Sequence, residues 1–130
     1  MKFFALIASI ALMALSGPVS AQTTLSPDYA VAKSLADQDE ASLAPAQSAN
    51  LRELQGQLLG EAVAACATPT PDLSAFVVVM ELGPDGKVVR TWLEGSSLLG
   101  MCFRKYVAGR TLMAPPRVPF FTSLEVSFTK

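Results

Sequence analysis

The sequence contains no histidine, and this absence narrows the chemistry that the chain can perform. Histidine is the usual general base near neutral pH and the commonest metal ligand in proteins. Without it the serines have no evident activating base, and Asp37, Asp39 and Glu40 lie in the stretch with the weakest structural signal. We therefore expect a protein without enzyme activity, cofactor or metal site.

Long hydrophobic stretches are also lacking, except for one at the N-terminus. Lys2 is followed by 13 uncharged, mostly apolar residues at positions 3–15, whereas a membrane span needs about 20. Val19-Ser20-Ala21 then supplies the small residues that signal peptidase recognises. We predict that residues 1–21 are a signal peptide cleaved after Ala21; a retained anchor is the alternative. The product would be periplasmic or secreted, with no stable insertion in a membrane.

Cysteine is scarce as well: the chain has only Cys66 and Cys102. An even number of cysteines in a small exported domain is typical of a disulfide, and here only one pairing exists. The alternative is a reactive thiol, which would need a nearby base or cation and an accessible sulfur. We expect the pair to form a structural disulfide.

Neither sign of charge dominates, because ten basic side chains stand against 11 acidic ones. A general nucleic-acid binder normally carries a basic excess, so we expect no nucleic-acid partner. Acidic residues are nevertheless concentrated over residues 22–50 and basic residues over residues 101–130. Either the acidic segment lies on or near a basic face of the same domain, or that face serves an anionic partner.

Residues 22–44 form an acidic leader that is poor in bulky apolar side chains. Ser26-Pro27-Asp28 has the residue types that begin a helix. The apolar residues after it would share one helical face: Tyr29, Ala32, Leu35 and Ala36. A partly disordered leader is the other interpretation of the same composition.

Residues 45–130 have the patterns of one small domain. Apolar residues recur every three or four positions from about residue 46 to residue 66, which predicts a helix. The members of this apolar stripe are Leu51, Leu54, Leu58, Leu59, Ala62, Val63 and Cys66. A Thr-Pro-Thr-Pro sequence at residues 68–71 then ends the helix.

A β-hairpin is predicted next. Residues 76–82 are almost all β-branched, aromatic or otherwise apolar, which indicates a strand. Gly83-Pro84-Asp85-Gly86 has the residue types of a tight turn, and residues 87–94 would form the returning strand. One face of that strand would carry Val89, Thr91 and Leu93, and the other Val88, Arg90 and Trp92.

A second helix and a last strand complete the pattern. Ser96 is a suitable N-cap for a helix that reaches about residue 110. Its inward residues would be Leu98, Leu99, Cys102, Phe103, Tyr106 and Val107. Residues 120–130 alternate between apolar and polar positions, which predicts a strand with one buried and one solvated face.

The predicted order is α-β-β-α-β. Because the second helix returns the chain, the last strand can pair antiparallel only with the first. We therefore predict an α+β fold: an antiparallel three-stranded sheet of order 2-1-3, with the two helices on one face and a disulfide joining them.

Four short motifs occur in a familiar order. They are Phe76-Val77-Val78-Val79-Met80, Pro84-Asp85-Gly86-Lys87-Val88, Gly95-Ser96-Ser97 and Leu112-Met113-Ala114-Pro115-Pro116. Their order and spacing resemble the C-terminal domain of TonB-type energy transducers over roughly residues 54–130. A cysteine pair joining the two helices is similar to those in disulfide-bearing relatives of that domain. Unlike TonB itself, this chain has a cleavable-type signal and no long Pro-rich linker, so the resemblance does not extend to energy transduction.

The resemblance implies a periplasmic adaptor that grips an extended segment of its partner, partly by strand addition at the last strand. Here the strand edge would present Phe121, Ser123, Glu125, Ser127 and Thr129, and Trp92 would add an aromatic contact on the outer sheet face. The same residues also suit an ordinary edge and a packed or partly exposed tryptophan.

We therefore expect a non-catalytic binding module that engages an unidentified envelope protein or peptide through the sheet edge or the open sheet face. The alternative is a small structural or inhibitory envelope protein that acts as a rigid body.

Overall fold

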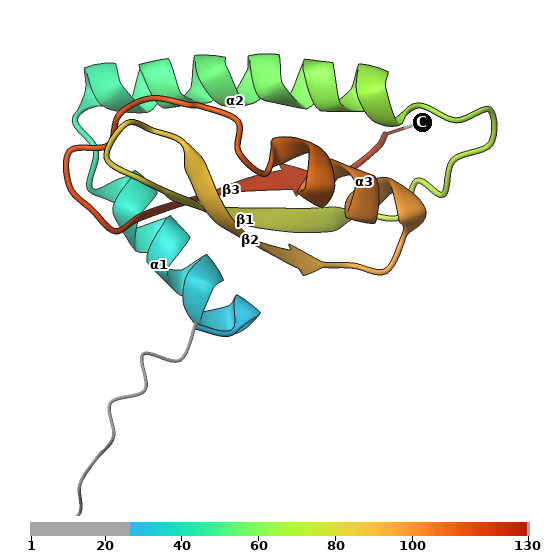
Figure 1. The fold of residues 1–130 in the computed structure, drawn as a ribbon, viewed down its shortest axis with the longest axis horizontal. Helices are drawn as coiled ribbons and strands as arrows, with labels where there is room; N and C mark the ends of the chain where they lie inside the picture. The colour runs from blue at the N-terminus through green and yellow to red at the C-terminus, as the bar shows by residue number, and fades with distance from the viewer. Residues whose placement is uncertain (1–26, 130) are drawn as a thin grey trace, which may run out of the picture.

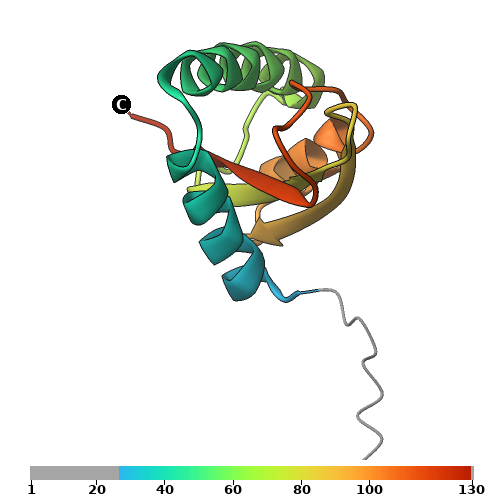
Figure 2. The ribbon, with the colours of Figure 1, turned by 90° about the vertical axis from the view of Figure 1, so that its left-hand side faces the viewer.

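The computed structural model describes residues 27–129, in which a three-stranded antiparallel sheet lies between two layers of helices (Figure 1 and Figure 2). The elements are α1 (Tyr29–Ala41), α2 (Pro45–Cys66), β1 (Phe76–Leu82), β2 (Val88–Glu94), α3 (Leu98–Val107) and β3 (Phe120–Val126). The strand order β2-β1-β3 and the α+β class are as predicted. The predicted signal peptide, residues 1–21, lies outside the described residues. Within residues 27–129, no helix is long and apolar enough to span a bilayer.

The main core lies between the sheet and the layer formed by α2 and α3. The central strand β1 sends Val78, Met80 and Leu82 into it, and all three are buried. Phe76 of β1 packs edge-on against Phe103 of α3, with 5.0 Å between the ring centroids. The nearly all-apolar sequence of β1 is thus explained by its central position, with helices on both sides.

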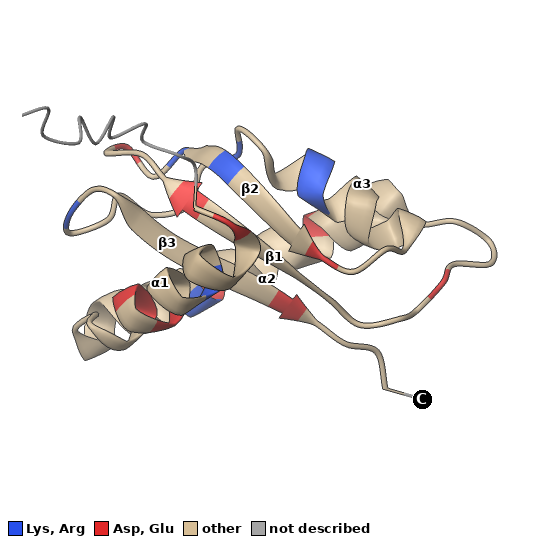
Figure 3. Ribbon diagram, turned by 90° about the horizontal axis from the view of Figure 1, so that it is seen from below, with Lys and Arg blue, Asp and Glu red and all other residues tan. Residues whose placement is uncertain are grey.

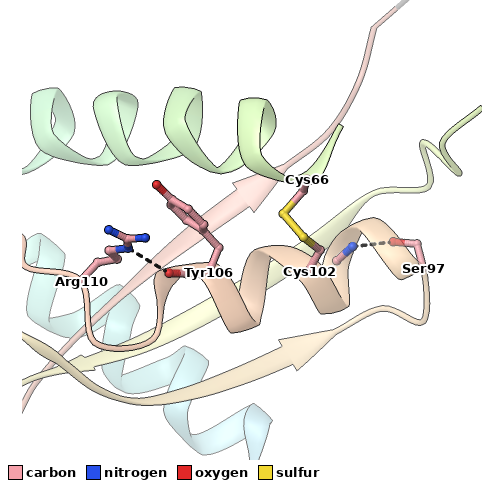
Figure 4. Close-up of a disulfide and its surroundings, with 6 residues drawn as sticks. Cys66, Ser97, Cys102, Tyr106 and Arg110 are labelled. Atoms are coloured by element: carbon pink, nitrogen blue, oxygen red, sulfur yellow. Dashed lines mark hydrogen bonds between the residues drawn. A yellow bond between two sulfur atoms is a disulfide. The ribbon is translucent and has the colours of Figure 1, made fainter. Parts of the chain in front are cut away.

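The predicted disulfide is present between Cys66 and Cys102. It joins the C-terminal end of α2 to the middle of α3 (Figure 4). Ser97, rather than the predicted Ser96, is the N-cap of α3, and its hydroxyl oxygen accepts a hydrogen bond from the N–H of Gly100. The observed helix, Leu98–Val107, lies within the predicted range of residues 96–110.

The leader contains the helix α1 rather than a disordered chain over residues 29–41. Asp28 is its N-cap, and the Asp28 carboxylate accepts a hydrogen bond of 2.9 Å from the N–H of Val31. Ala32 and Ala36 are completely buried, and they face the side of the sheet opposite α2 and α3. Figure 2 shows α1 and α2 on opposite sides of the sheet.

Several predicted positions are wrong at the margins of the elements. Val63 is 43% exposed and Leu98 is 81% exposed, so neither belongs to the core. Val63 lies at the rim of the apolar stripe of α2, and Leu98 lies on the side of α3 away from Phe103. Strand β3 ends at Val126, which leaves Phe128 beyond the sheet and 36% exposed.

A β-bulge changes the predicted faces of β2. Glu81 pairs with Arg90 but its neighbour Leu82 pairs with Val88, so Val89 is an extra residue in the ladder. Val88 is therefore buried in the main core and Val89 is 53% exposed, the reverse of the prediction. Beyond the bulge, Trp92 lies on the outer face as expected.

The bulge predicts opposite effects for two adjacent valines. Val88→Ala should reduce the free energy of unfolding by about 2 kcal/mol, because it removes buried methyl groups and leaves a cavity. Val89→Ala should change it by less than about 0.5 kcal/mol. Urea denaturation of the two variants measures both values, and equal losses would contradict the bulged register.

The disulfide predicts a large loss on removal. It closes a loop of 36 positions, for which the chain-entropy relation gives about 3–4 kcal/mol of stabilisation. The double variant Cys66→Ser, Cys102→Ser should therefore unfold at a much lower urea concentration than the oxidised protein. The reduced wild-type protein is the control, and it should resemble the variant; unchanged midpoints for both would show that the bond adds nothing.

Candidate partner-binding site

The outer face of the sheet is covered by α1, which contacts all three strands and β3 most extensively. Ala32 and Ala36 of the helix pack on Val79 of β1 and Phe121 of β3 in a second, smaller core. Partly buried side chains complete it: Tyr29, Leu35, Val77 and Trp92. The two alanines let the helix backbone approach the sheet closely. The prediction of an open, solvated outer face is therefore wrong where α1 lies.

The edge of β3 is occupied by side chains. The N–H of Phe121 donates a hydrogen bond of 2.8 Å to the Asp39 carboxylate, and the N–H of Ser123 donates one of 3.0 Å to the Glu40 carboxylate. The carbonyl oxygen of Ser123 accepts a hydrogen bond of 3.1 Å from the Gln55 amide of α2. These are the peptide groups that point away from β1, so three side chains stand where an added strand would pair.

The two carboxylates are themselves held in place. Arg117 donates to the Asp39 carboxylate at 2.8 Å, and only 13% of the Asp39 side chain is exposed. The Thr122 hydroxyl donates to Glu40 and accepts a hydrogen bond of 2.7 Å from Gln55. In the part of the chain that the structure describes, every buried side-chain polar atom has a hydrogen-bond partner. The acidic leader thus meets a cation of the basic C-terminal region through Asp39 and Arg117.

The N-terminal half of α1 is anchored to β2 and β3 on the same outer face of the sheet. The indole N–H of Trp92 donates a hydrogen bond of 2.7 Å to the carbonyl oxygen of Pro27. The Tyr29 hydroxyl is hydrogen-bonded to Glu94, and Lys33 forms an ion pair of 2.8 Å with Glu125. Both halves of the helix are therefore fastened to the sheet.

Two side chains of α1 have shifted proton affinities. Burial and the hydrogen bond to Glu94 raise the pKa of Tyr29 from 10.0 to about 12. Burial lowers the pKa of Lys33, but the hydrogen bonds and negative charges of Asp37 and Glu125 outweigh it and hold this pKa above its ordinary value. Both groups therefore favour the docked helix at neutral pH.

Most of the predicted partner-binding residues contact α1 or the segment just before it. Phe121 and Ser123 do so through the Asp39 and Glu40 carboxylates, Glu125 through Lys33, and Trp92 through Pro27. Ser127 and Thr129 are different: they follow β3 and are exposed. The structure thus brings four of the six residues together beneath one helix of the same chain.

Sequence reasoning missed Asp39, Glu40 and Gln55, the side chains that occupy the edge. The stretch around the two acids has little hydrophobic contrast because its inward residues are alanines. A usable signal was present, however: Asp28 before a helix with alanines four positions apart, combined with an unexplained acidic excess.

No protein family, curated protein or solved structure matches this chain. Among residues 27–129, no group of three or more Cys, Asp or Glu side chains is placed to hold a metal ion.

The raised pKa of Tyr29 predicts a pH-dependent stability. Because the folded chain binds this proton more tightly, the stabilisation is complete below pH 10 and is lost as the pH rises toward 12. Ultraviolet titration of tyrosinate should show one late transition that is absent from Tyr29→Phe, which keeps only Tyr106. A Tyr29 transition near pH 10 would contradict the burial of this hydroxyl.

Proposed function

We propose that this chain is a non-catalytic binding module of the bacterial envelope, in which a segment of a partner protein or peptide replaces α1 on the β3 edge and the outer sheet face. One observation carries the proposal: side-chain carboxylates, rather than a neighbouring strand, hold the outward N–H groups of Phe121 and Ser123. Those N–H groups are the donors that strand addition uses.

The exchange of α1 for a partner strand would keep the outward N–H groups of Phe121 and Ser123 hydrogen-bonded. Carbonyl oxygens of the incoming strand would accept from Phe121 and Ser123, while the Asp39 and Glu40 carboxylates would return to water. A buried charge that loses its partner is costly, but these two would be fully hydrated once released. The exchange therefore conserves the hydrogen bonds of these two N–H groups.

The apolar contact of α1 is small enough to be exchanged. Its two fully buried side chains are alanines, and each methyl group contributes only about 1 kcal/mol when buried. Beneath them lie Val79 and Phe121, larger side chains that a partner with bulkier residues would cover. A partner can thus gain more apolar contact at this place than α1 does.

Two expectations from the sequence support the same proposal. Residues 1–21 have the pattern of an export signal, which would place the module in the periplasm or outside the cell. The resemblance to the C-terminal domain of TonB-type transducers implies strand addition at the last strand, which is β3 in this chain.

A second candidate function is a structural or inhibitory protein that acts as a rigid body. The anchoring of α1 at both ends favours it: Pro27 and Lys33 contact the sheet near one end of the helix, and Asp39 and Glu40 near the other. In this case α1 would remain docked during function.

Releasing the edge distinguishes the two functions. The double variant Asp39→Asn, Glu40→Gln weakens both charge-assisted hydrogen bonds and should capture about tenfold more of a partner from envelope extract than the wild-type protein does. The readout is a quantitative pull-down with the exported, oxidised protein. Circular dichroism and thermal unfolding check that each variant is folded.

Two further variants serve as controls. Glu53→Gln with Glu61→Gln makes the same change in net charge on the exposed side of α2 and should behave as wild type. Adding Ser123→Pro to the released variant removes one edge donor and should abolish the gain. A partner recovered equally by all four proteins would exclude capture at the edge and favour the rigid-body function.

A further inference from the structure

The solvent side of α3 carries large apolar residues. Leu98 is 81% exposed and Met101 is 48% exposed, and Lys105 continues the same stripe at the spacing of successive turns. The buried side of the helix, with Phe103 and Val107, points to the sheet. The solvent side of a helix is usually polar, so two adjacent large apolar side chains indicate an interaction surface.

Cations lie at the C-terminal end of this stripe. Arg104 and Lys105 lie in the last turn of α3, and Arg110 follows it. The Arg110 guanidinium stacks on the Tyr106 ring at 4.3 Å and donates to the Tyr106 carbonyl oxygen, so it is held beside the helix (Figure 4). Lys105 and Arg110 both line an open hollow between α3 and the end of α2.

Acidic residues are nearly absent from this part of the molecule. The sequence contains no Asp or Glu between residues 95 and 124. Of the described residues that line the two hollows beside α3, the single acid is Asp72, near the N-terminal end of the helix. Figure 3 shows Lys or Arg on α3, whereas several acidic positions lie on α1.

We propose that this α3 face docks on the surface of an anionic phospholipid bilayer. Leu98 and Met101 enter the boundary between headgroups and acyl chains, and Lys105 and Arg110 contact lipid phosphates. The combination selects the partner: exposed apolar side chains require an apolar phase, and the adjacent cations require negative charge beside it. The contact is peripheral, because α3 has 10 residues and lies along the surface.

The docked orientation would leave the candidate partner-binding site free. α3 belongs to the layer on one face of the sheet, and α1 covers the other face (Figure 2). A module held at a membrane by α3 would therefore present α1 and the β3 edge away from the bilayer.

Vesicle flotation tests the proposal with the exported, oxidised protein. It should float with vesicles of phosphatidylglycerol and phosphatidylcholine, less so at high salt, and should not float with pure phosphatidylcholine. Lys105→Gln and Arg110→Gln should each weaken binding about fivefold, and Leu98→Ser with Met101→Ser should abolish it.

Matched controls lie elsewhere on the surface. Val31→Ser with Val118→Ser removes two exposed apolar residues, and Arg52→Gln removes an exposed cation of α2; both controls should bind as wild type. The absence of binding to anionic vesicles, equal binding to neutral ones, or equal losses in the control and α3 variants would each overturn the proposal.

Discussion

Unpaired peptide groups at the sheet edges are the constraint on which this structure depends. A three-stranded sheet has one central strand and two edges, so most of its backbone could attract another chain. On β3, Asp39, Glu40 and Gln55 occupy the outward groups. On β2, Val88 exchanges backbone hydrogen bonds with the segment around Arg110, and Arg104 donates to the carbonyl oxygen of Thr91. The two edges are covered by different means: β2 partly by main chain and β3 by side chains.

This difference gives the two helical layers different roles. The layer of α2 and α3 covers the main core and carries the disulfide, and separating it from the sheet would expose Phe76 and Met80 of β1 together with Phe103 of α3. The layer of α1 rests on two buried alanines, on the partly buried Tyr29 and Leu35, and on polar contacts that water can replace. Local opening in proteins begins where few apolar contacts are made, so α1 is the element with the lower cost of release.

The elements that could be predicted from the sequence are those determined by neighbouring residues. The apolar run of β1, the turn at Gly83-Pro84-Asp85-Gly86 and the pairing of two cysteines each depend on neighbouring residues or on elimination, and the structure confirms the resulting fold. The bulge at Val89 was not predictable, because an alternating pattern does not reveal an extra residue in one strand. The edge contacts were missed because Asp39 and Phe121 are 82 positions apart and their attraction leaves no periodic pattern.

The position of the disulfide has a mechanical consequence for α2. The bond fastens the C-terminal end of this helix to α3, while its N-terminal end is joined to α1 by only the residues between Ala41 and Pro45. Departure of α1 would therefore remove a constraint from one end of α2 and leave the other end covalently fixed. The helix would keep its place over β3 and its Gln55 amide would still donate to the Ser123 carbonyl oxygen, so a newly bound segment would pair only with the N–H groups that Asp39 and Glu40 release.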